Sequence, residues 1–167
     1  FNVSSTVSIL LAACGSYVAK HGNRSITSKS GSADMLEAIG VNLNLSLENS
    51  AKMLEETGFT FMFAQNHHPC MKHIMPIRKS IPHRTIFNIL GPLSNPATVS
   101  KQLIGVFDKS YINKLAYALD MLDTKRSMIV SSNDGMDEFS ISDITYASSI
   151  YNGKIEDFEI NPEDYGM

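Results

Sequence analysis

Apolar and polar positions along the chain fall into blocks that predict helices and strands in turn. A largely apolar run over residues 7–16 predicts a buried helix, and a short strand is expected at 16–19. Three later blocks, FTFMFA (59–64), QLIGVF (102–107) and SMIVSS (127–132), have the length and composition of buried strands.

Helix signals lie between these strands. Ser32 is a good N-cap and Gly40 a good C′ residue for one helix, and Ser46 and Gly58 bound a second. A third helix is expected at 110–122, and the tail at 145–160 is expected to add strands. The apolar face of this third helix would be formed by Leu115, Ala118, Leu119 and Leu122. Strands that alternate with helices predict an α/β fold with a mostly parallel central sheet flanked by helices.

Composition and charge exclude several classes of protein. A chain of 167 residues with 43% hydrophobic residues is long enough for one domain with a sizeable core. The net charge of −3 argues against a general nucleic-acid binder, because no strongly basic surface is implied. Cys14 and Cys70 stand far apart and form no CxxC pair, so we expect a reducing compartment and a cytoplasmic protein.

The apolar segment near the start has a second interpretation. VSILLAACGS (7–16) looks like a lipoprotein signal with its cleavage cysteine, but residues 1–13 contain no Lys or Arg. The basic region of a signal peptide is therefore missing, and a buried helix is the better interpretation. No stretch approaches the length of about 20 apolar residues that a membrane-spanning helix needs, so no membrane partner is expected.

The polar segment KHGNRSITSKSGSAD (20–34) separates two apolar elements and is rich in hydrogen-bond donors. In an α/β sheet, a strand–loop–helix unit places its loop beyond the carboxyl end of the strand, where ligands bind. Backbone N–H groups of a Gly/Ser-rich loop and a helix N-terminus attract anions, and Lys20 and Arg24 add full positive charges. The segment fits neither GxGxxG nor GxxxxGK[ST]. It predicts a polyphosphate site, with a solvated turn-rich loop as the alternative.

Two further motifs offer metal ligands. SSNDGMDEFS places Asp134, Asp137 and Glu138 just beyond a strand, and one or two carboxylates are what Mg²⁺ takes beside substrate phosphates. An acidic surface turn is the alternative. HHPCMKH (67–73) has histidines and a cysteine, but the spacing fits no usual zinc pattern. We expect one or two of these histidines to line a pocket instead.

Two arginines flank Ile81-Pro82-His83. Arg78 and Arg84 are suited to bidentate capture of a carboxylate, and a buried ion pair is an equally ordinary role for either. Gly91-Pro92 and the following Asn95-Pro96 predict a rigid turn with backbone that can approach a ligand closely.

Five blocks of the chain stand in a familiar order: KHGNRSITSKSGSADMLEAIGVNLNLS, HPCMKHIMPIRKSIPHRTIFNILGPLSNPA, QLIGVF, DGMDEFS and PEDYGM. Together they resemble the anthranilate phosphoribosyltransferase family over essentially all 167 residues. The resemblance implies a catalytic domain like that of nucleoside phosphorylases and phosphoribosyltransferases, truncated at both ends. We expect residues 1–167 to form a single partial domain. The family's N-terminal helical domain, Gly-rich pyrophosphate loop and C-terminal part are absent from it, so the isolated segment is expected to be impaired.

The resemblance also implies site residues. The site for phosphoribosyl pyrophosphate (PRPP) would contain Asn2, Val3, Ser4, Ser5, Lys20, His21, Gly22, Asn23, Arg24, Ser25, Ile26, Thr27, Ser28 and Ser32. Anthranilate would meet Asn23, His68, Arg78, Gly91 and Pro92, and Mg²⁺ would bind Ser4, Asp137 and Glu138. No residue is implied as a covalent or acid–base catalyst.

The implied reaction is Mg²⁺-dependent transfer of the 5-phosphoribosyl group from PRPP to the amine of anthranilate, with release of pyrophosphate, in tryptophan biosynthesis. The resemblance implies a homodimeric parent, and some relatives carry a fused or associated glutamine amidotransferase. Three alternatives stay open. They are a nucleoside phosphorylase of similar fold, a nucleic-acid-binding relative, and a purely structural fragment. An intact Asp137-Glu138 pair and the negative net charge argue against the second.

Overall fold

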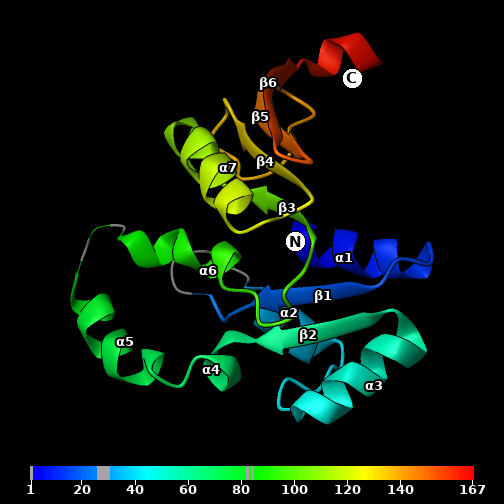
Figure 1. The fold of residues 1–167 in the computed structure, drawn as a ribbon, viewed down its shortest axis with the longest axis vertical. Helices are drawn as coiled ribbons and strands as arrows, with labels where there is room; N and C mark the ends of the chain where they lie inside the picture. Colours follow the sequence, from blue (N-terminus) through cyan, green and yellow to red (C-terminus); the bar gives the residue numbers. More distant parts are fainter. Residues whose placement is uncertain (1, 26–30, 82, 84) are drawn as a thin grey trace. The chain divides into compact units, whose positions relative to one another are not determined.

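The structure is a computed structural model that describes residues 2–25, 31–81, 83 and 85–167. The chain divides into two compact units, Phe1–Ala97 and Thr98–Met167, and each contains parallel strands and helices (Figure 1). The predicted α/β class is therefore confirmed. No helix in the described ranges has both the length and the apolar character needed to cross a membrane.

The first unit is built on a pair of parallel strands, β1 (Val18–Gly22) and β2 (Phe59–Phe63), whose register runs from Val18 opposite Phe59 to Gly22 opposite Phe63. All of β2 is buried. The helices of the first unit are α1 (Val3–Ala13), α2 (Ser32–Ala38), α3 (Leu47–Thr57), α4 (Ala64–His67), α5 (Met71–Ser80), η1 (Ile86–Asn88) and α6 (Leu90–Leu93). The core consists of Ala33, Leu36, Leu43, Phe59, Phe61 and Phe63.

Local signals located most boundaries in this unit. The Ser46 hydroxyl accepts a hydrogen bond from the Asn49 N–H, and Gly58 ends α3 with φ +74°, both as predicted. Gly40 has φ +92° and forms the expected C′ position of α2, with its N–H donated to Glu37 O. The N-cap of α2 is Gly31 rather than Ser32, which is the first helical residue.

Two predictions for the first unit need correction. The first strand runs over Val18–Gly22 instead of 16–19, because its pairing with β2 extends through Gly22. The helix predicted over 7–16 is α1, but its apolar side chains are not buried: Leu10 is 61% exposed and Leu11 is 45% exposed. Apolar residues in an unbroken run surround the whole helix, and packing on one side can bury only a single stripe of them.

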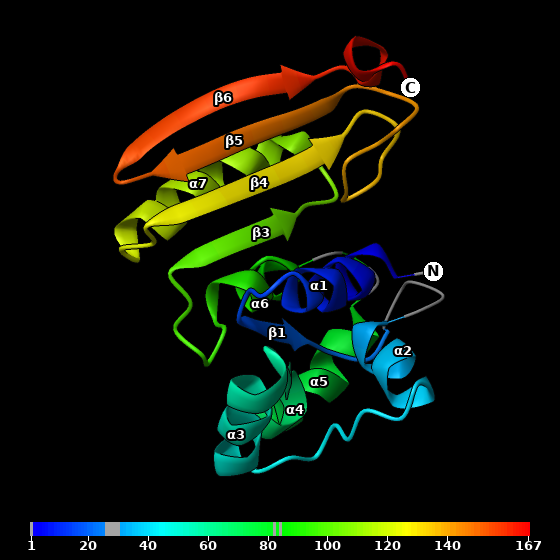
Figure 2. The same ribbon diagram turned by 90° about the vertical axis from the view of Figure 1, so that its right-hand side faces the viewer.

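The second unit is a four-stranded sheet in the order β3-β4-β5-β6. Its strands are β3 (Lys101–Gly105), β4 (Arg126–Ser132), β5 (Thr145–Tyr151) and β6 (Lys154–Ile160), and its helices are η2 (Lys109–Tyr111), α7 (Ile112–Met121) and η3 (Pro162–Tyr165). Strands β3 and β4 are parallel, whereas β5 and β6 are added antiparallel. Figure 2 shows α7 lying against β4 and β5.

Sequence features explain this arrangement. Asn152 and Gly153 both have positive φ, at +49° and +78°, which is the two-residue turn that joins antiparallel strands tightly. On α7, Leu115 and Leu119 are buried as predicted, but Leu122 is 58% exposed. Leu122 is the C-cap of the helix and so lies past the end of its buried stripe.

Candidate functional site

The predicted polyphosphate segment begins within a strand and ends on a helix. Lys20, His21 and Gly22 form the last part of β1, and Asn23–Ser25 follow it. A Cβ on Gly22 would lie 2.3 Å from Ser32 Oγ and 2.9 Å from the Phe61 ring, so only glycine allows this strand end to approach α2 so closely. Ser32 Oγ and the Ala33 N–H both donate to the carbonyl of Asn23, at 3.4 and 3.3 Å.

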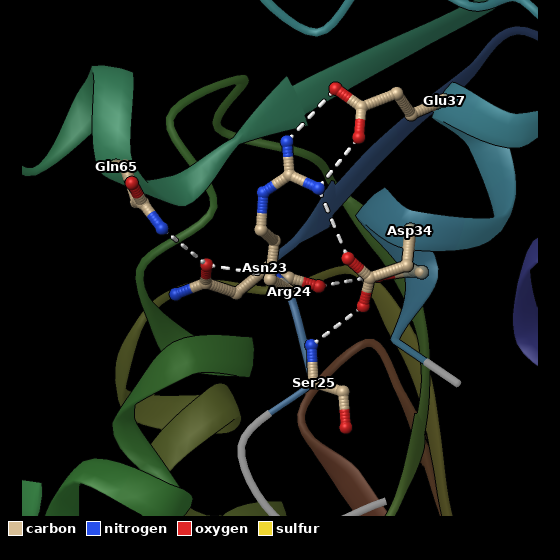
Figure 3. Close-up of polar contacts among 7 residues, drawn as sticks. Asn23, Arg24, Ser25, Asp34, Glu37 and Gln65 are labelled. Carbon is tan, nitrogen blue, oxygen red and sulfur yellow. Dashed lines mark hydrogen bonds and ion pairs between the residues drawn. The ribbon is translucent and has the colours of Figure 1, made fainter. Parts of the chain in front are cut away.

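Asn23 has an amide whose orientation is fixed. Its Oδ1 accepts two hydrogen bonds, from the Arg24 N–H at 2.8 Å and from Gln65 Nε2 at 3.3 Å (Figure 3). Among the described residues no acceptor pairs with its Nδ2 group. Asn23 therefore presents two N–H donors to a ligand from a rigid position.

The guanidinium of Arg24 is paired with two carboxylates of α2. Its guanidinium donates to both oxygens of Glu37, at 2.7 and 2.9 Å, and to Asp34 at 3.1 Å (Figure 3). The other Asp34 oxygen accepts the Ser25 N–H at 3.0 Å. Hydrogen bonding to Glu37, and then to Asp34, raises the pKa of Arg24, while the Ser25 N–H lowers the pKa of Asp34 and Arg24 lowers the pKa of Glu37. All of these groups are charged at neutral pH.

A second set of predicted PRPP contacts meets at the N-terminus of α1. Asn2 is the N-cap and accepts the Ser5 N–H through its side chain at 3.0 Å. Lys20 Nζ donates to Ser4 Oγ at 3.1 Å, so strand β1 and this helix end share a cation. Ser5 is fully buried, and its hydroxyl has no hydrogen-bond partner among the described residues. Ser4 Oγ thus accepts a hydrogen bond from the Lys20 ammonium, and its role as a Mg²⁺ ligand stays a prediction.

Predicted anthranilate contacts gather around His21. His21 Nδ1 lies 3.2 Å from the Gly91 carbonyl, and its Nε2 lies 3.2 Å from Nε2 of His68. Burial is the main cause that lowers the pKa of His21, which makes the ring neutral at pH 7. A carbonyl can only accept, so the proton sits on Nδ1 of His21, and His68 donates from its Nε2. The two hydrogen bonds thus fix the tautomer of His21 and make His68 the donor between the two rings.

Other predicted residues are less tightly placed. Arg78 lies in α5, half-buried, and its guanidinium makes no hydrogen bond or ion pair with the residues that the structure describes. Gly91 and Pro92 lie in the helical turn α6 rather than in the expected rigid turn, because Leu90–Leu93 closes as one helical turn. Val3 is the first residue of α1. Ile26, Thr27, Ser28 and Arg84 lie outside the described residues.

The acidic motif forms a braced loop after β4. Asp134 accepts the Ser140 hydroxyl at 2.7 Å and the Met136 N–H at 3.1 Å, and the Ser140 hydrogen bond is the main cause that lowers the pKa of Asp134. The buried Ser140 also donates its N–H to Thr145 Oγ1 at 3.0 Å. Asp134 is therefore part of the scaffold of the loop.

Asp137 and Glu138 are placed differently. A Cβ on Gly105 would lie 1.7 Å from the carbonyl of Asp137, so the loop rests directly on the backbone of β3. Asp137 is exposed and makes no hydrogen bond or ion pair with any described residue. Two adjacent carboxylates fit Mg²⁺, which prefers oxygen ligands and completes its shell with water or phosphate oxygens. In the described ranges no group of three or more His, Cys, Asp or Glu could hold a metal, which leaves the zinc interpretation of HHPCMKH without support.

Sequence reasoning missed four residues that build these sites. Asp34 and Glu37, the partners of Arg24, stand three positions apart and so share one face of α2. That spacing could have suggested a common cationic partner. Gly105 and Ser140, which support the acidic loop, carried no local signal, because their partners are distant in sequence or lie within an irregular loop.

The whole chain is similar in sequence to a known protein family. The family model described as glycosyl transferase family, a/b domain, matches residues 1–167, the whole chain. The chain belongs to this family. Among curated relatives of this glycosyl transferase family member, the anthranilate phosphoribosyltransferase of Rubrobacter xylanophilus is 45% identical over 166 residues, which are 99% of this chain and 48% of the relative. The chain spans about half the length of the curated relatives it matches.

Solved structures give the same likeness. Anthranilate phosphoribosyltransferase from Thermus thermophilus is 39% identical with a TM-score of 0.87, over 99% of this chain and 49% of that one. The enzyme from Saccharomyces cerevisiae, in complex with PRPP and Mg, is 30% identical with a TM-score of 0.87, over 100% and 46%. A further yeast structure holds 4-fluoroanthranilate; it is 28% identical with a TM-score of 0.84, over 100% and 45%. The predicted family resemblance is confirmed.

Proposed function

We propose that the protein carrying this chain transfers the phosphoribosyl group of PRPP to anthranilate with the help of Mg²⁺, as a step in tryptophan biosynthesis. The observation that supports this most is the gathering of Ser4, Lys20 and Asn23 around the carboxyl end of β1. A cation, hydroxyls and a fixed amide there suit a phosphorylated sugar. The relatives' names and the PRPP and Mg in the yeast complex support the same substrate.

In the proposed reaction, the bond from ribose C1 to the pyrophosphate oxygen breaks and a bond from C1 to the anthranilate nitrogen forms. The amine then loses one proton to solvent. An aromatic amine is already neutral at pH 7, so no strong base is needed. The demands on the protein are orientation and stabilisation of the negative charge that grows on the leaving group.

Residues of β1, α1 and the acidic loop after β4 would orient the substrates and stabilise the charge on the leaving group. Lys20 would place its ammonium beside the pyrophosphate, and the buried hydroxyl of Ser5, which lacks a partner among the described residues, would hydrogen-bond to it. Asp137 and Glu138 would hold Mg²⁺, which neutralises pyrophosphate charge when bound. Asn23 would donate its Nδ2 hydrogens to the substrates.

The acceptor needs a carboxylate-binding group and a flat wall. Arg78 has a guanidinium without a partner among the described residues, and it would take the anthranilate carboxylate. His68, whose ring is hydrogen-bonded to His21, would form part of the wall together with Gly91 and Pro92. The 4-fluoroanthranilate in a yeast relative supports this class of acceptor.

The test is an assay of the full-length protein by the loss of anthranilate fluorescence. We expect a loss that requires PRPP and Mg²⁺ and that EDTA abolishes. Asn23→Ala should reduce kcat/KM by about a hundredfold, since two donors to the substrates disappear. Asn49→Ala, which changes an exposed asparagine of α3, is the matched control. A folded protein that consumes no anthranilate would refute the proposal.

A further inference from the structure

Arg24 lies in the segment expected to bind PRPP, yet its surroundings do not suit an anion. The guanidinium contacts two carboxylates, so the group of Arg24, Asp34 and Glu37 carries a net negative charge. Three of its five N–H donors are already used, two of them in a bidentate pair with Glu37. A phosphate placed on Arg24 would meet both carboxylates at close range.

The same contacts hold the backbone that precedes and follows Arg24. Asp34 accepts the Ser25 N–H, and the Ala33 N–H and Ser32 hydroxyl donate to the Asn23 carbonyl. Figure 3 shows Arg24 reaching from the end of β1 to the helix that carries both carboxylates. The segment 23–25 is thus joined to α2 on both sides of Arg24.

The glycine at position 31 also indicates that these backbone segments approach each other closely. A Cβ on Gly31 would lie 2.2 Å from Ser25 N and 2.7 Å from Asp34 Oδ2, so the residue at this N-cap has to be glycine. The Arg24 guanidinium also lies 5.7 Å from the centroid of the Phe63 ring, at the end of β2. Arg24 therefore connects the ends of β1, β2 and α2.

We propose that Arg24 is a positioning residue. With Asp34 and Glu37 it fixes segment 23–25 on α2, and it thereby positions the Asn23 amide without touching PRPP. This inference rests on the proposed function for the ligand, but the attachment itself exists in the free protein. It assigns a role to Asp34 and Glu37, and it replaces the direct phosphate contact expected for Arg24.

The decisive variant is Glu37→Ala, which leaves Arg24 in place. If Arg24 bound PRPP directly, removing a neighbouring negative charge would leave PRPP affinity equal or stronger. Positioning predicts the reverse: Glu37→Ala and Arg24→Ala should each weaken PRPP binding by about tenfold, which is the scale of one charge-assisted hydrogen bond. The double variant should be no weaker than either single one, because both remove the same unit.

Two measurements on the full-length protein test this. Amide hydrogen exchange, read by NMR or mass spectrometry, should show Ser25 and Ala33 exchanging about tenfold faster in Glu37→Ala without any ligand, the scale on which a local opening responds to one lost hydrogen bond. Calorimetric PRPP titration gives the affinities. Lys52→Ala, which removes a remote exposed ion pair with Glu56, is the matched control and should change neither.

The outcomes separate the two proposals. Unchanged exchange at Ser25 and Ala33 in Glu37→Ala overturns the positioning role, whatever PRPP does. Faster exchange together with PRPP affinity that equals or exceeds that of the wild type also overturns it, and returns Arg24 to the role of ligand. A wild-type protein that binds no PRPP refutes the proposed function. The exchange data then test only whether Arg24, Asp34 and Glu37 attach segment 23–25 to α2.

Discussion

The loop after β1 and the loop after β4 both follow the carboxyl end of a parallel strand, and both carry charged residues expected at a substrate site. The first is held by charges: Arg24 is occupied by Asp34 and Glu37. The second is held by neutral donors and backbone, through Ser140 and the contact of the loop with Gly105. A charged side chain whose charge is already matched by opposite charges of the fold is therefore a poor candidate ligand.

Asp134 and Asp137 show the same difference between a side chain used by the fold and one that is not, within a single loop. Asp134 has a hydroxyl and an N–H on its two oxygens, whereas Asp137 is exposed and free of such contacts among the described residues. Sequence alone offered both as metal ligands. The variants below test whether scaffold and ligand roles divide in this way.

The largest effect is expected from Gly105→Ala. The added methyl would collide with the Asp137 carbonyl, so the acidic loop must move, with a loss of about 1–3 kcal/mol in the free energy of unfolding and a loss of Mg²⁺-dependent turnover. Urea unfolding measures the first and the fluorescence assay the second. Gly91→Ala, where a Cβ would meet nothing within 4 Å, is the stability control. Equal stability of the two variants would show that the loop does not rest on β3.

Replacing both acidic residues, in Asp137→Asn/Glu138→Gln, should affect function more than stability. We expect turnover to fall by about a hundredfold, since the metal would lose both protein carboxylates. In Asp137→Asn alone the melting temperature should stay close to that of the wild type, because the Asp137 carboxylate makes no hydrogen bond or ion pair with a described residue. Asp164→Asn changes another exposed acid of the same unit and should leave turnover unchanged. A large fall in the melting temperature of Asp137→Asn would instead assign Asp137 to the scaffold.

Ser140→Ala should affect stability more than function. The buried hydroxyl donates to Asp134 and accepts the N–H groups of Ser142 and Asp143, so its removal takes away three hydrogen bonds of the loop. A loss of about 1–3 kcal/mol in the free energy of unfolding is expected, with a smaller fall in turnover at saturating Mg²⁺. If turnover is lost while stability is unchanged, Ser140 acts on the ligand rather than on the loop.

The smallest effect is a pH dependence that arises in the first unit. Burial lowers the pKa of His21 from 6.5, so the unfolded chain binds more protons than the folded chain just below that pH. The stabilising contribution is complete above pH 6.5 and is lost as the pH falls through the lowered folded value. His21→Asn should flatten the pH dependence of the free energy of unfolding between about pH 5 and 7, the range in which histidine titrates. A pH dependence of His21→Asn equal to that of the wild type would contradict this.

Sequence predicted what depends on neighbouring residues. Ser46 and Gly58 located the ends of α3 correctly because capping and left-handed termination are local. Asn152-Gly153 is a local signal of the same kind that the sequence-based prediction did not use, and it forms the tight turn between the antiparallel strands β5 and β6.

What escaped prediction depends on distant partners or on how much surface is covered. His21 and His68 are 47 positions apart, and only the parallel pairing of β1 with β2 brings their rings together. Arg24 and Glu37 are 13 positions apart, and their contact depends on how the end of β1 packs against α2. The exposure of Leu10 in α1 could not be read from an apolar run, because hydrophobicity does not say how many sides of a helix are packed.

The most direct test of the central claim, that PRPP binds here and does so with Mg²⁺, is calorimetric titration of PRPP into the full-length protein with and without Mg²⁺. The account predicts binding that strengthens by at least about tenfold with Mg²⁺ in the wild type, and loses that gain in Asp137→Asn/Glu138→Gln. PRPP binding that is indifferent to Mg²⁺, or a Mg²⁺ effect that survives in that variant, would contradict it.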